Sequence, residues 1–280
     1  MTVVCAAHLP YPSRAMNPTT NIAVRAARQA ASIMMRSFNR IDTLTIAEKQ
    51  AHDYVSEVDR AAEQAIIETI RRSYPHHAIL AEESGSHDGN EYQWIIDPLD
   101  GTTNYLHGFP QFSISIAMQH RGQLQSAVVY DPLRDEMFTA SRGNGALLNG
   151  RRLRVSEQKS LQGALIGTGI PFRDQTYLDA YLAMMKAMVR DTAGIRRPGS
   201  AALDLAYGAA GRTDGFWELG LSSWDMAGGI LLVREAGGTV TDIRGGDGHL
   251  ESGNLVAGNL RVHREMLATL KPHVPERMRA

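Results

Sequence analysis

The sequence lacks several features that mark whole classes of proteins. Its single cysteine, Cys5, can form no intrachain disulfide, and a zinc site built from several thiolates is excluded. The 29 basic and 30 acidic residues leave a formal net charge of −1, which argues against a general affinity for nucleic acid. No run approaches the roughly 18 apolar residues of a membrane-spanning helix, and the apolar residues 1–7 lack the basic start of a signal peptide. We therefore expect a cytoplasmic protein with no membrane contact.

Familiar cofactor and metal motifs are also missing. The sequence contains no G-x-x-x-x-G-K-[ST] phosphate loop and no H-E-x-x-H zinc motif. The pair Gly167 and Gly169 lacks the third glycine of a dinucleotide fingerprint, because Phe172 stands at that position. The 10 histidines are scattered along the chain. These observations argue against P-loop, dinucleotide-binding and zinc-peptidase functions.

What is present is typical of a globular protein. The 280 residues are 43% hydrophobic and 21% charged, and this length fits one large domain or two ordinary ones. Residues 1–20 contain three prolines and show no clear period, so we expect a leader outside the fold. Apolar residues then recur at helical spacing, which predicts helices over 21–38 and 58–72.

A change of pattern predicts two units, 21–155 and 156–280. In the first, short apolar or alternating runs follow the helices, and Asn149-Gly150 is a strong hairpin signal, which predicts helices packed on an antiparallel sheet. In the second, strands alternate with helices, which predicts a layered α/β arrangement. The strands expected in the first unit are 78–81, 93–96, 112–116, 125–130, 136–140 and the hairpin 146–155. In the second, strands are expected at 164–168, 215–218, 239–242 and 255–257, and helices at 177–189, 201–210, 225–236 and 261–270.

Carboxylates directly follow two of the predicted strands. Glu82 ends one strand, and Asp97 and Asp100 end another. Because Pro98 and Gly101 disfavour a helix there, a turn can aim both aspartates and the carbonyl of residue 99 at one point. Oxygen ligands of this kind suit Mg²⁺.

The residues after this turn favour a phosphate. Gly101 lets the backbone approach a ligand closely, and Thr102-Thr103 begins a short predicted helix whose free N–H groups attract anions. Other interpretations stay open, because Asp-Pro and Asp-Gly are common turn formers and Asp59 and Asp225 both stand where a helix cap is expected.

Three segments together resemble one known family. They are Glu82–Gly85 (E-E-S-G), Trp94–Asn104 (W-I-I-D-P-L-D-G-T-T-N) and Trp224–Gly229 (W-D-M-A-G-G). Their order and spacing are similar to those of the inositol monophosphatases, members of the lithium-sensitive, Mg²⁺-dependent phosphatase superfamily, over about residues 20–270. The segment 196–206 is most similar to the bacterial SuhB-type members. The resemblance implies a layered αβαβα sandwich of the inositol monophosphatase/fructose bisphosphatase type, an α+β or α/β fold.

The resemblance also implies a ligand set for two or three Mg²⁺ ions. Glu82, Asp97 and the carbonyl of Leu99 match the ligands of the first ion, and Asp97, Asp100 and Asp225 match those of the second. A third, looser ion would use Glu82 and water.

Catalytic and substrate-binding residues follow from the same resemblance. Asp59 and Thr102 match the pair that orients the attacking water, together with Glu82, and the amides of Gly101 and Thr102 would hold phosphate. The residues expected to contact substrate are Leu99, Asp100, Gly101, Thr102, Arg196, Ala201, Glu218 and Asp225.

The implied activity is hydrolysis of myo-inositol monophosphate to inositol and phosphate, by a homodimer that lithium inhibits through the second metal site. Three related activities compete with it, the phosphatases of histidinol phosphate, fructose bisphosphate and adenosine 3′,5′-bisphosphate.

A binding role is the alternative of another class. SuhB-type proteins are linked to transcription antitermination and ribosomal RNA synthesis through RNA polymerase and its elongation factors. The basic clusters Arg151-Arg152-Arg154 and Arg196-Arg197 are candidate contacts for these partners. A solvated hairpin face, or a substrate or dimer contact, explains the same arginines.

Overall fold

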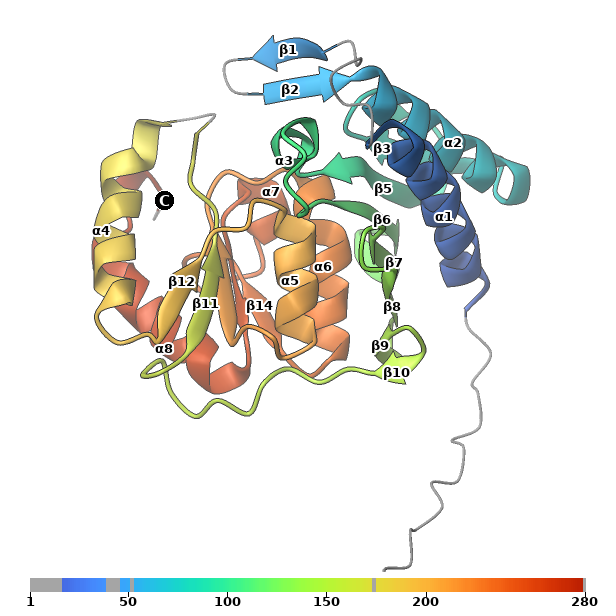
Figure 1. Cartoon of the computed structure of the whole chain (residues 1–280). Coiled ribbons are helices and arrows are strands. Elements are labelled where there is room, and N and C mark those ends of the chain that lie inside the picture. Colours follow the sequence, from blue (N-terminus) through green and yellow to red (C-terminus); the bar gives the residue numbers. More distant parts are fainter. Residues whose placement is uncertain (1–16, 39–45, 51–52, 173–174, 279–280) are drawn as a thin grey trace, which may run out of the picture.

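The computed structural model describes residues 17–38, 46–50, 53–172 and 175–278. Helices and sheets alternate in five layers, so the predicted αβαβα sandwich is confirmed (Figure 1). The central helices are apolar on nearly all sides, because a sheet covers each of their faces. The outer layers are α1 (Pro18–Phe38) with α2 (Glu57–Ser73), and α4 (Leu178–Val189) with α8 (Leu260–Leu270); the central layer is α5 (Ala201–Ala209) with α6 (Ser223–Glu235).

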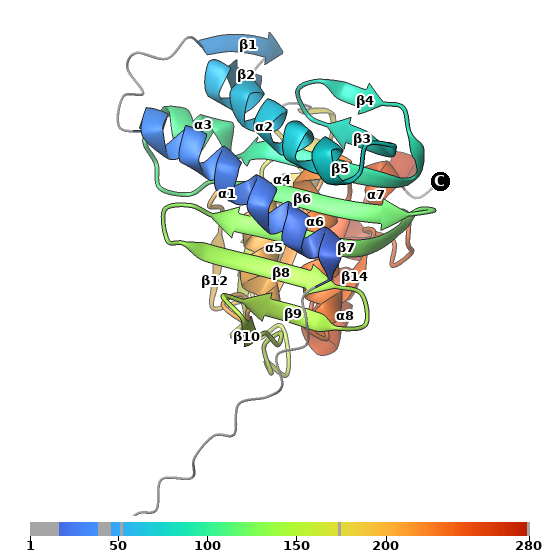
Figure 2. The ribbon, with the colours of Figure 1, turned by 90° about the vertical axis from the view of Figure 1, so that its right-hand side faces the viewer.

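The first sheet has eight strands in the order β10-β9-β8-β7-β6-β5-β3-β4. Its neighbours are antiparallel except β3 and β5, which run parallel. Figure 2 shows α1 and α2 lying across one face of this sheet, and α5 and α6 lie behind it. Residues 94–100 of β5 are all buried, as expected for a strand covered on both faces. The strands are β3 (His77–Ala81), β4 (Gly85–His87), β5 (Asn90–Asp100), β6 (Ser113–His120), β7 (Gln123–Asp131), β8 (Glu136–Ser141), β9 (Gly145–Leu148) and β10 (Arg151–Arg152).

The second sheet has five strands in the order β12-β11-β13-β15-β14. β11 runs parallel to β12 and β13, whereas β15 runs antiparallel to both of its neighbours. The alternation predicted after residue 156 therefore produces a sheet of its own. Its strands are β11 (Leu165–Thr168), β12 (Gly194–Arg196), β13 (Gly215–Glu218), β14 (Thr239–Thr241) and β15 (Leu255–Gly258).

Helix α1 begins three residues earlier than the period of the sequence indicated. Pro18 occupies the first helical position, where a missing N–H costs nothing, and the Asn17 side chain accepts the N–H of Thr19 at 3.1 Å. Residues 18–20 of the expected leader thus belong to this helix, and residues 1–16 lie outside the described residues.

The Asn149-Gly150 hairpin is confirmed. Both residues have positive φ, +48° and +79°, as a type I′ turn requires.

Several short elements were not predicted, because they are too short to carry a period. They are β1 (Ile46–Gln50), β2 (Asp53–Ser56), β4, β12 and α7 (His249–Ser252); three short 3₁₀ turns lie at Gln175–Tyr177, Lys271–His273 and Glu276–Met278. Among the helices of the described residues, none is long and apolar enough to span a membrane.

Candidate active site

A cavity of about 860 Å³ opens where strands of both sheets end. The first sheet contributes the segments that follow β3 and β5, including α3 (Thr102–Leu106). The second contributes the segments after β11, β12 and β13, together with the beginnings of α5 and α6. Residues far apart in the sequence therefore face one space.

Three carboxylates meet in this cavity. Asp97, Asp100 and Asp225 each offer an oxygen atom, and these atoms lie within 4.8 Å of one another. The pairing of β5 with β6 shifts register between Asp97 and Asp100, where Pro98 has no N–H to donate to the ladder. Asp225 lies in the first turn of α6, and its side chain accepts the N–H of Ser222 at 2.6 Å. Ser222 is the N-cap residue, so Asp225 is not the cap itself but the third helical residue of a capping box, and the same carboxylate also belongs to the cluster.

Burial and mutual repulsion raise the pKa values of two of these carboxyls. Burial, followed by the charges of Glu82, Asp100 and Asp225, raises the pKa of the Asp97 carboxyl well above its ordinary value. Burial raises the pKa of Asp100 to about 6, although hydrogen bonds from Ser200 and Ala202 lower it. A bound divalent cation would offset this repulsion, and an all-carboxylate donor set suits a hard cation. The residues present therefore fit a metal site.

Asp100 is held by the beginning of α5. One of its oxygens accepts the Ser200 hydroxyl at 2.6 Å and the N–H of Ala202 at 2.8 Å. The N–H of Leu99 donates to Asp97 at 3.0 Å, which fixes that carboxylate against its own turn. Both aspartates are therefore oriented by backbone groups before any ligand binds.

Glu82 and Thr102 line the cavity, whereas Asp59 lies behind Thr102. The Thr102 hydroxyl lies 3.0 Å from the carbonyl oxygen of Leu99 and 3.2 Å from an oxygen of Asp59. Asp59 is buried on α2, and burial raises its pKa although the hydrogen bonds from Ser56 and Thr102 lower it. Ser56 is the N-cap residue of α2, and Asp59 is again the third helical residue of a capping box rather than the cap itself.

Gly101 occupies a position that other residues would strain. Its φ is +94°, and a Cβ atom there would lie 3.0 Å from the carbonyl oxygen of Gln111 and 3.1 Å from that of Gly199. This conformation starts α3, whose first residues line the cavity. The predicted helix at Thr102-Thr103 is confirmed.

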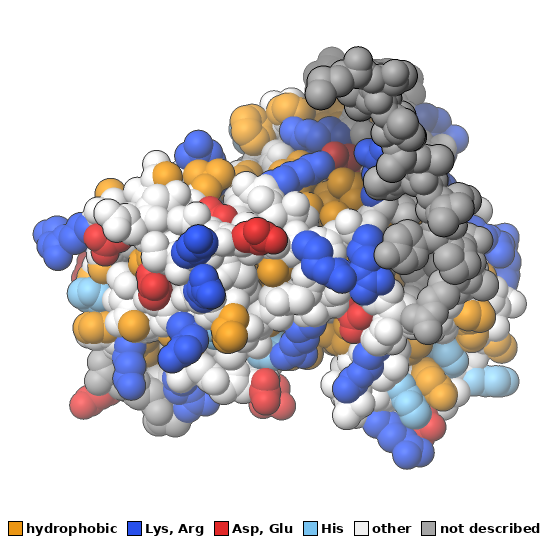
Figure 3. Space-filling view, turned by 90° about the horizontal axis from the view of Figure 1, so that it is seen from below, with side chains coloured by type: hydrophobic (Ala, Val, Ile, Leu, Met, Phe, Trp, Pro, Cys, Tyr) orange, Lys and Arg blue, Asp and Glu red, His pale blue; other side chains and the backbone are white. Residues whose placement is uncertain are grey.

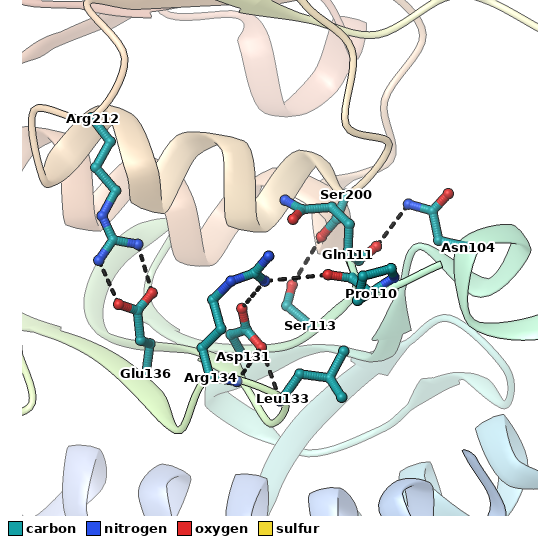
Figure 4. A network of polar contacts seen from close by, with 10 residues as sticks. All are labelled: Asn104, Pro110, Gln111, Ser113, Asp131, Leu133, Arg134, Glu136, Ser200 and Arg212. Carbon is teal, nitrogen blue, oxygen red and sulfur yellow. Dashed lines mark hydrogen bonds and ion pairs between the residues drawn. The ribbon is translucent and has the colours of Figure 1, made fainter. Parts of the chain in front are cut away.

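A polar network ties the loop before α5 to the first sheet (Figure 4). The Asn104 amide donates to the carbonyl oxygens of Gln111 at 2.7 Å and Pro198 at 2.8 Å. The Ser113 and Ser200 hydroxyls lie 3.1 Å apart. At the far end of α5, Arg212 pairs with Glu136 of β8 (Figure 4). Both ends of α5 are thus fixed to the first sheet.

Comparison with known proteins places this arrangement in a family. The model of the inositol monophosphatase family matches residues 15–276. The chain belongs to the inositol monophosphatase family. The family expected from the three sequence segments is thereby confirmed, and it is a family of phosphatases.

Individual members of the inositol monophosphatase family are similar over nearly their whole length. The "Nus factor SuhB" of Pseudomonas aeruginosa is 58% identical over 266 residues, 93% of this chain and 98% of that protein. The extragenic suppressor protein suhB of Bartonella henselae has a solved structure that is 43% identical with a TM-score of 0.90, covering 92% of this chain and all of that one. The inositol monophosphatase of Anabaena is 38% identical with a TM-score of 0.79, covering 92% and 96%.

One residue that we expected to contact substrate, Arg196, does not line the cavity. Arg196 is exposed on β12 and donates to the carbonyl of Ile195, its own neighbour. Arg197 lines the cavity instead, with its guanidinium 4.9 Å from the centre of the Phe172 ring. The expectation that Arg196 contacts substrate therefore does not fit this structure, in which the neighbouring Arg197 lines the cavity.

The other expected substrate residues line the cavity, and Asp204 joins them. Ala201 begins α5 and Glu218 ends β13. Asp204 is buried on α5, and burial and the charges of Glu218 and Asp100 raise its pKa well above the ordinary value, against the effect of Arg197. A lone acid within the apolar run 201–210 is a sequence signal that could have identified it.

Proposed function

We propose that this protein is a Mg²⁺-dependent phosphatase that hydrolyses myo-inositol monophosphate to inositol and phosphate. The observation that carries the proposal is the meeting of Asp97, Asp100 and Asp225 in a cavity large enough for a phosphorylated polyol. Membership of the inositol monophosphatase family supports it. So does its similarity to the solved structure of a staphylococcal inositol monophosphatase with inositol monophosphate bound, which is 26% identical with a TM-score of 0.77.

The carboxylates divide between two metal positions. Glu82, Asp97 and the carbonyl of Leu99 would hold one Mg²⁺; Asp97, Asp100 and Asp225 would hold another, and Glu82 with water a looser third. Such ions, when bound, lower the pKa of a bound water and stabilise charge on the phosphoryl and leaving oxygens. Asp97 is the bridging ligand in this assignment, because it contributes to both positions.

The neighbouring residues orient the attacking water and the phosphate. Asp59 accepts a hydrogen bond from Thr102 and is itself fixed by Ser56, so it can hold the Thr102 hydroxyl toward a water molecule. Glu82 accepts the proton that this water gives up. The N–H groups of Gly101 and Thr102, at the start of α3, bind the phosphate oxygens.

Residues from both sheets bind the polyol. Asp100, Ala201 and Glu218 contact its hydroxyl groups, and Arg197 takes the role that the sequence assigned to Arg196. These contacts position the leaving group without changing the chemical step, so we expect a Glu218→Gln variant to alter substrate preference more than maximal turnover.

Phosphate release with Mg²⁺ and four substrates tests this function. The substrates are inositol-1-phosphate, histidinol phosphate, fructose bisphosphate and adenosine 3′,5′-bisphosphate. We expect the highest kcat/KM for the inositol ester. A higher kcat/KM for another of the four compounds would make that compound the substrate. If none of them released phosphate in a Mg²⁺-dependent way, the phosphatase activity itself would be contradicted.

Lithium should inhibit through the second metal position. Asp100 and Asp225 come from separate segments, and Li⁺ can sit between them after the leaving group departs. Bound there, Li⁺ would hold the product phosphate in the cavity, and its single charge would stabilise the leaving oxygen poorly in another turnover. Initial rates at several Li⁺ concentrations and fixed Mg²⁺ should show uncompetitive or mixed inhibition, and Asp225→Asn should lower both activity and lithium sensitivity. Purely competitive inhibition would place Li⁺ elsewhere.

We propose a second function in transcription, as a homodimeric binding partner of RNA polymerase and its elongation factors. The 58% identity to the Nus factor SuhB of P. aeruginosa favours it. Arg151 and Arg152 are exposed on the edge strand β10, and Figure 3 shows basic side chains spread over the face seen from below. A pull-down with the Asp97→Asn variant should retain the polymerase, whereas Arg151→Ala with Arg152→Ala should release it. Loss of binding by Asp97→Asn alone would tie binding to catalysis.

The dimer is tested separately by light scattering. We expect twice the 30.7 kDa chain mass at micromolar concentration. A monomer mass together with full activity would remove the dimer from the proposal.

A further inference from the structure

We propose that Glu63, outside the cavity, is a positioning residue that holds Glu82 in the metal cluster. The inference rests on the proposed function, because it gives Glu63 its role through a metal ligand. Glu63 lies on α2 and only 3% of its surface is exposed. It is not among the residues that line the cavity, so it can act only through others.

The Glu63 carboxylate binds the backbone that directly follows Glu82. One of its oxygens accepts the N–H of Glu83 at 2.8 Å, and the other accepts the N–H of Ser84 at 2.8 Å. A carboxylate that uses both oxygens on adjacent amides fixes position and direction together. The backbone of this segment is therefore anchored to α2.

Glu82 needs such an anchor because its neighbours repel it. Its charge acts on the buried Asp97 carboxyl together with those of Asp100 and Asp225. A hydrogen bond joins Glu82 to the Asp97 carboxyl while one of them is protonated. Once both are ionised, and before a cation binds, repulsion favours movement of Glu82 out of the cluster. The connection is short, since β3 ends at Ala81 and β4 begins at Gly85, so holding two of its three residues restrains the third.

One face of α2 serves two parts of the site. Asp59 and Glu63 stand four residues apart, which places their side chains on the same side of the helix. Asp59 accepts the Thr102 hydroxyl from the segment after β5, and Glu63 accepts two amides from the segment after β3. Figure 2 shows α2 lying beside β3 and β5, the strands that lead into both segments. Helix α2 thus fixes the segment of the metal ligand Glu82 through Glu63, and the Thr102 hydroxyl through Asp59.

The test replaces Glu63 with glutamine. An amide presents an NH₂ group to one of the two backbone donors, so one hydrogen bond becomes a repulsive contact. In metal-free protein, hydrogen exchange at the amides of Glu83 and Ser84 should be faster in Glu63→Gln than in the wild type. By calorimetry with Mg²⁺ alone, its affinity should fall by about tenfold to a hundredfold. Saturating Mg²⁺ should restore most of kcat, with an unchanged KM for substrate.

Two variants control for a general effect on the fold. Glu68→Gln removes an exposed charge from the same helix and should change neither exchange nor Mg²⁺ affinity. Glu63→Asp keeps both acceptor oxygens, so its amide exchange rates and Mg²⁺ affinity should fall between those of the wild type and of Glu63→Gln. If Glu63→Gln does not fold, Glu63→Asp decides the question.

The outcomes separate this inference from the proposed function. Wild-type Mg²⁺ affinity in Glu63→Gln with protected amides, or a loss of kcat that excess Mg²⁺ does not rescue, would overturn the role of Glu63 alone. A wild-type protein that binds no Mg²⁺ would overturn the proposed function and this role with it.

Discussion

Replacing Asp97 with asparagine should lower kcat by about a thousandfold or more, because an amide binds Mg²⁺ poorly and metal stabilisation of charge is worth several kcal/mol. Asp97 is the residue whose loss should matter most, since it is buried and shared by both proposed metal positions. The fold should survive. The amide cannot ionise among the charges that raise the pKa of the Asp97 carboxyl, so at alkaline pH the Tm of the metal-free protein should equal or exceed that of wild type.

Steady-state rates across a Mg²⁺ series, with Tm measured on the same samples, test this prediction. Asp179→Asn is a matched control, because it makes the same chemical change at an exposed site on α4. It should leave kcat unchanged. Near-wild-type turnover of Asp97→Asn at moderate Mg²⁺ would remove Asp97 from the metal site.

Mg²⁺ should stabilise the protein, and more so at higher pH. In the metal-free fold the pKa of Asp100 is about 6 against an ordinary 3.8, and that of Asp97 is also raised. Above pH 4 the folded protein thus holds protons that the unfolded chain has released, so these groups lower the free energy of unfolding as pH rises through about 4 to 7. Mg²⁺ must displace the same protons, which weakens its binding at low pH.

Thermal unfolding with and without Mg²⁺ measures this coupling. At a concentration about 100 times Kd, binding adds roughly 2.7 kcal/mol, a Tm increase of about 5–10 °C near pH 8. Near pH 5 the increase should be much smaller. Burial lowers the pKa values of His249 and His263, which also make stability depend on pH. They do so with and without metal, so their contribution cancels in the difference between the two Tm values. A Tm increase independent of pH would contradict the assignment of Mg²⁺ to this cluster.

The long elements could be predicted because their periods are local. The helical spacing of 21–38 and 58–72 reflects which side of each helix is buried, and the structure confirms both helices. The alternation of 112–116 correctly indicated a strand, but its serines are buried as well, because helices cover both faces of this sheet. The Asn149-Gly150 turn was equally predictable, since few residue pairs adopt two positive φ angles. Where a boundary moved, as at Pro18, the deciding contact was a side-chain cap.

The site could be predicted only in part, because its geometry is long-range. Strand-end acids and a turn at Pro98 indicated oxygen ligands, but physical reasoning alone did not show that Asp225 meets Asp97. The choice between Arg196 and Arg197 depends on the pairing of β12, a strand of three residues with no period. Glu63 lies three residues before Ile66 and seven before Ile70, beside the apolar face of its helix, but an acid at the edge of such a face usually points to solvent.

Diffraction from crystals soaked with Mn²⁺ and phosphate tests the central claim most directly, since Mn²⁺ replaces Mg²⁺ at oxygen sites and its anomalous scattering identifies it. The account predicts two strong anomalous peaks in the cavity, one bound by Glu82, Asp97 and the Leu99 carbonyl and the other by Asp97, Asp100 and Asp225, with phosphate on the first amides of α3. A cavity without anomalous peaks at saturating Mn²⁺, or metal bound only away from Asp97, would contradict it.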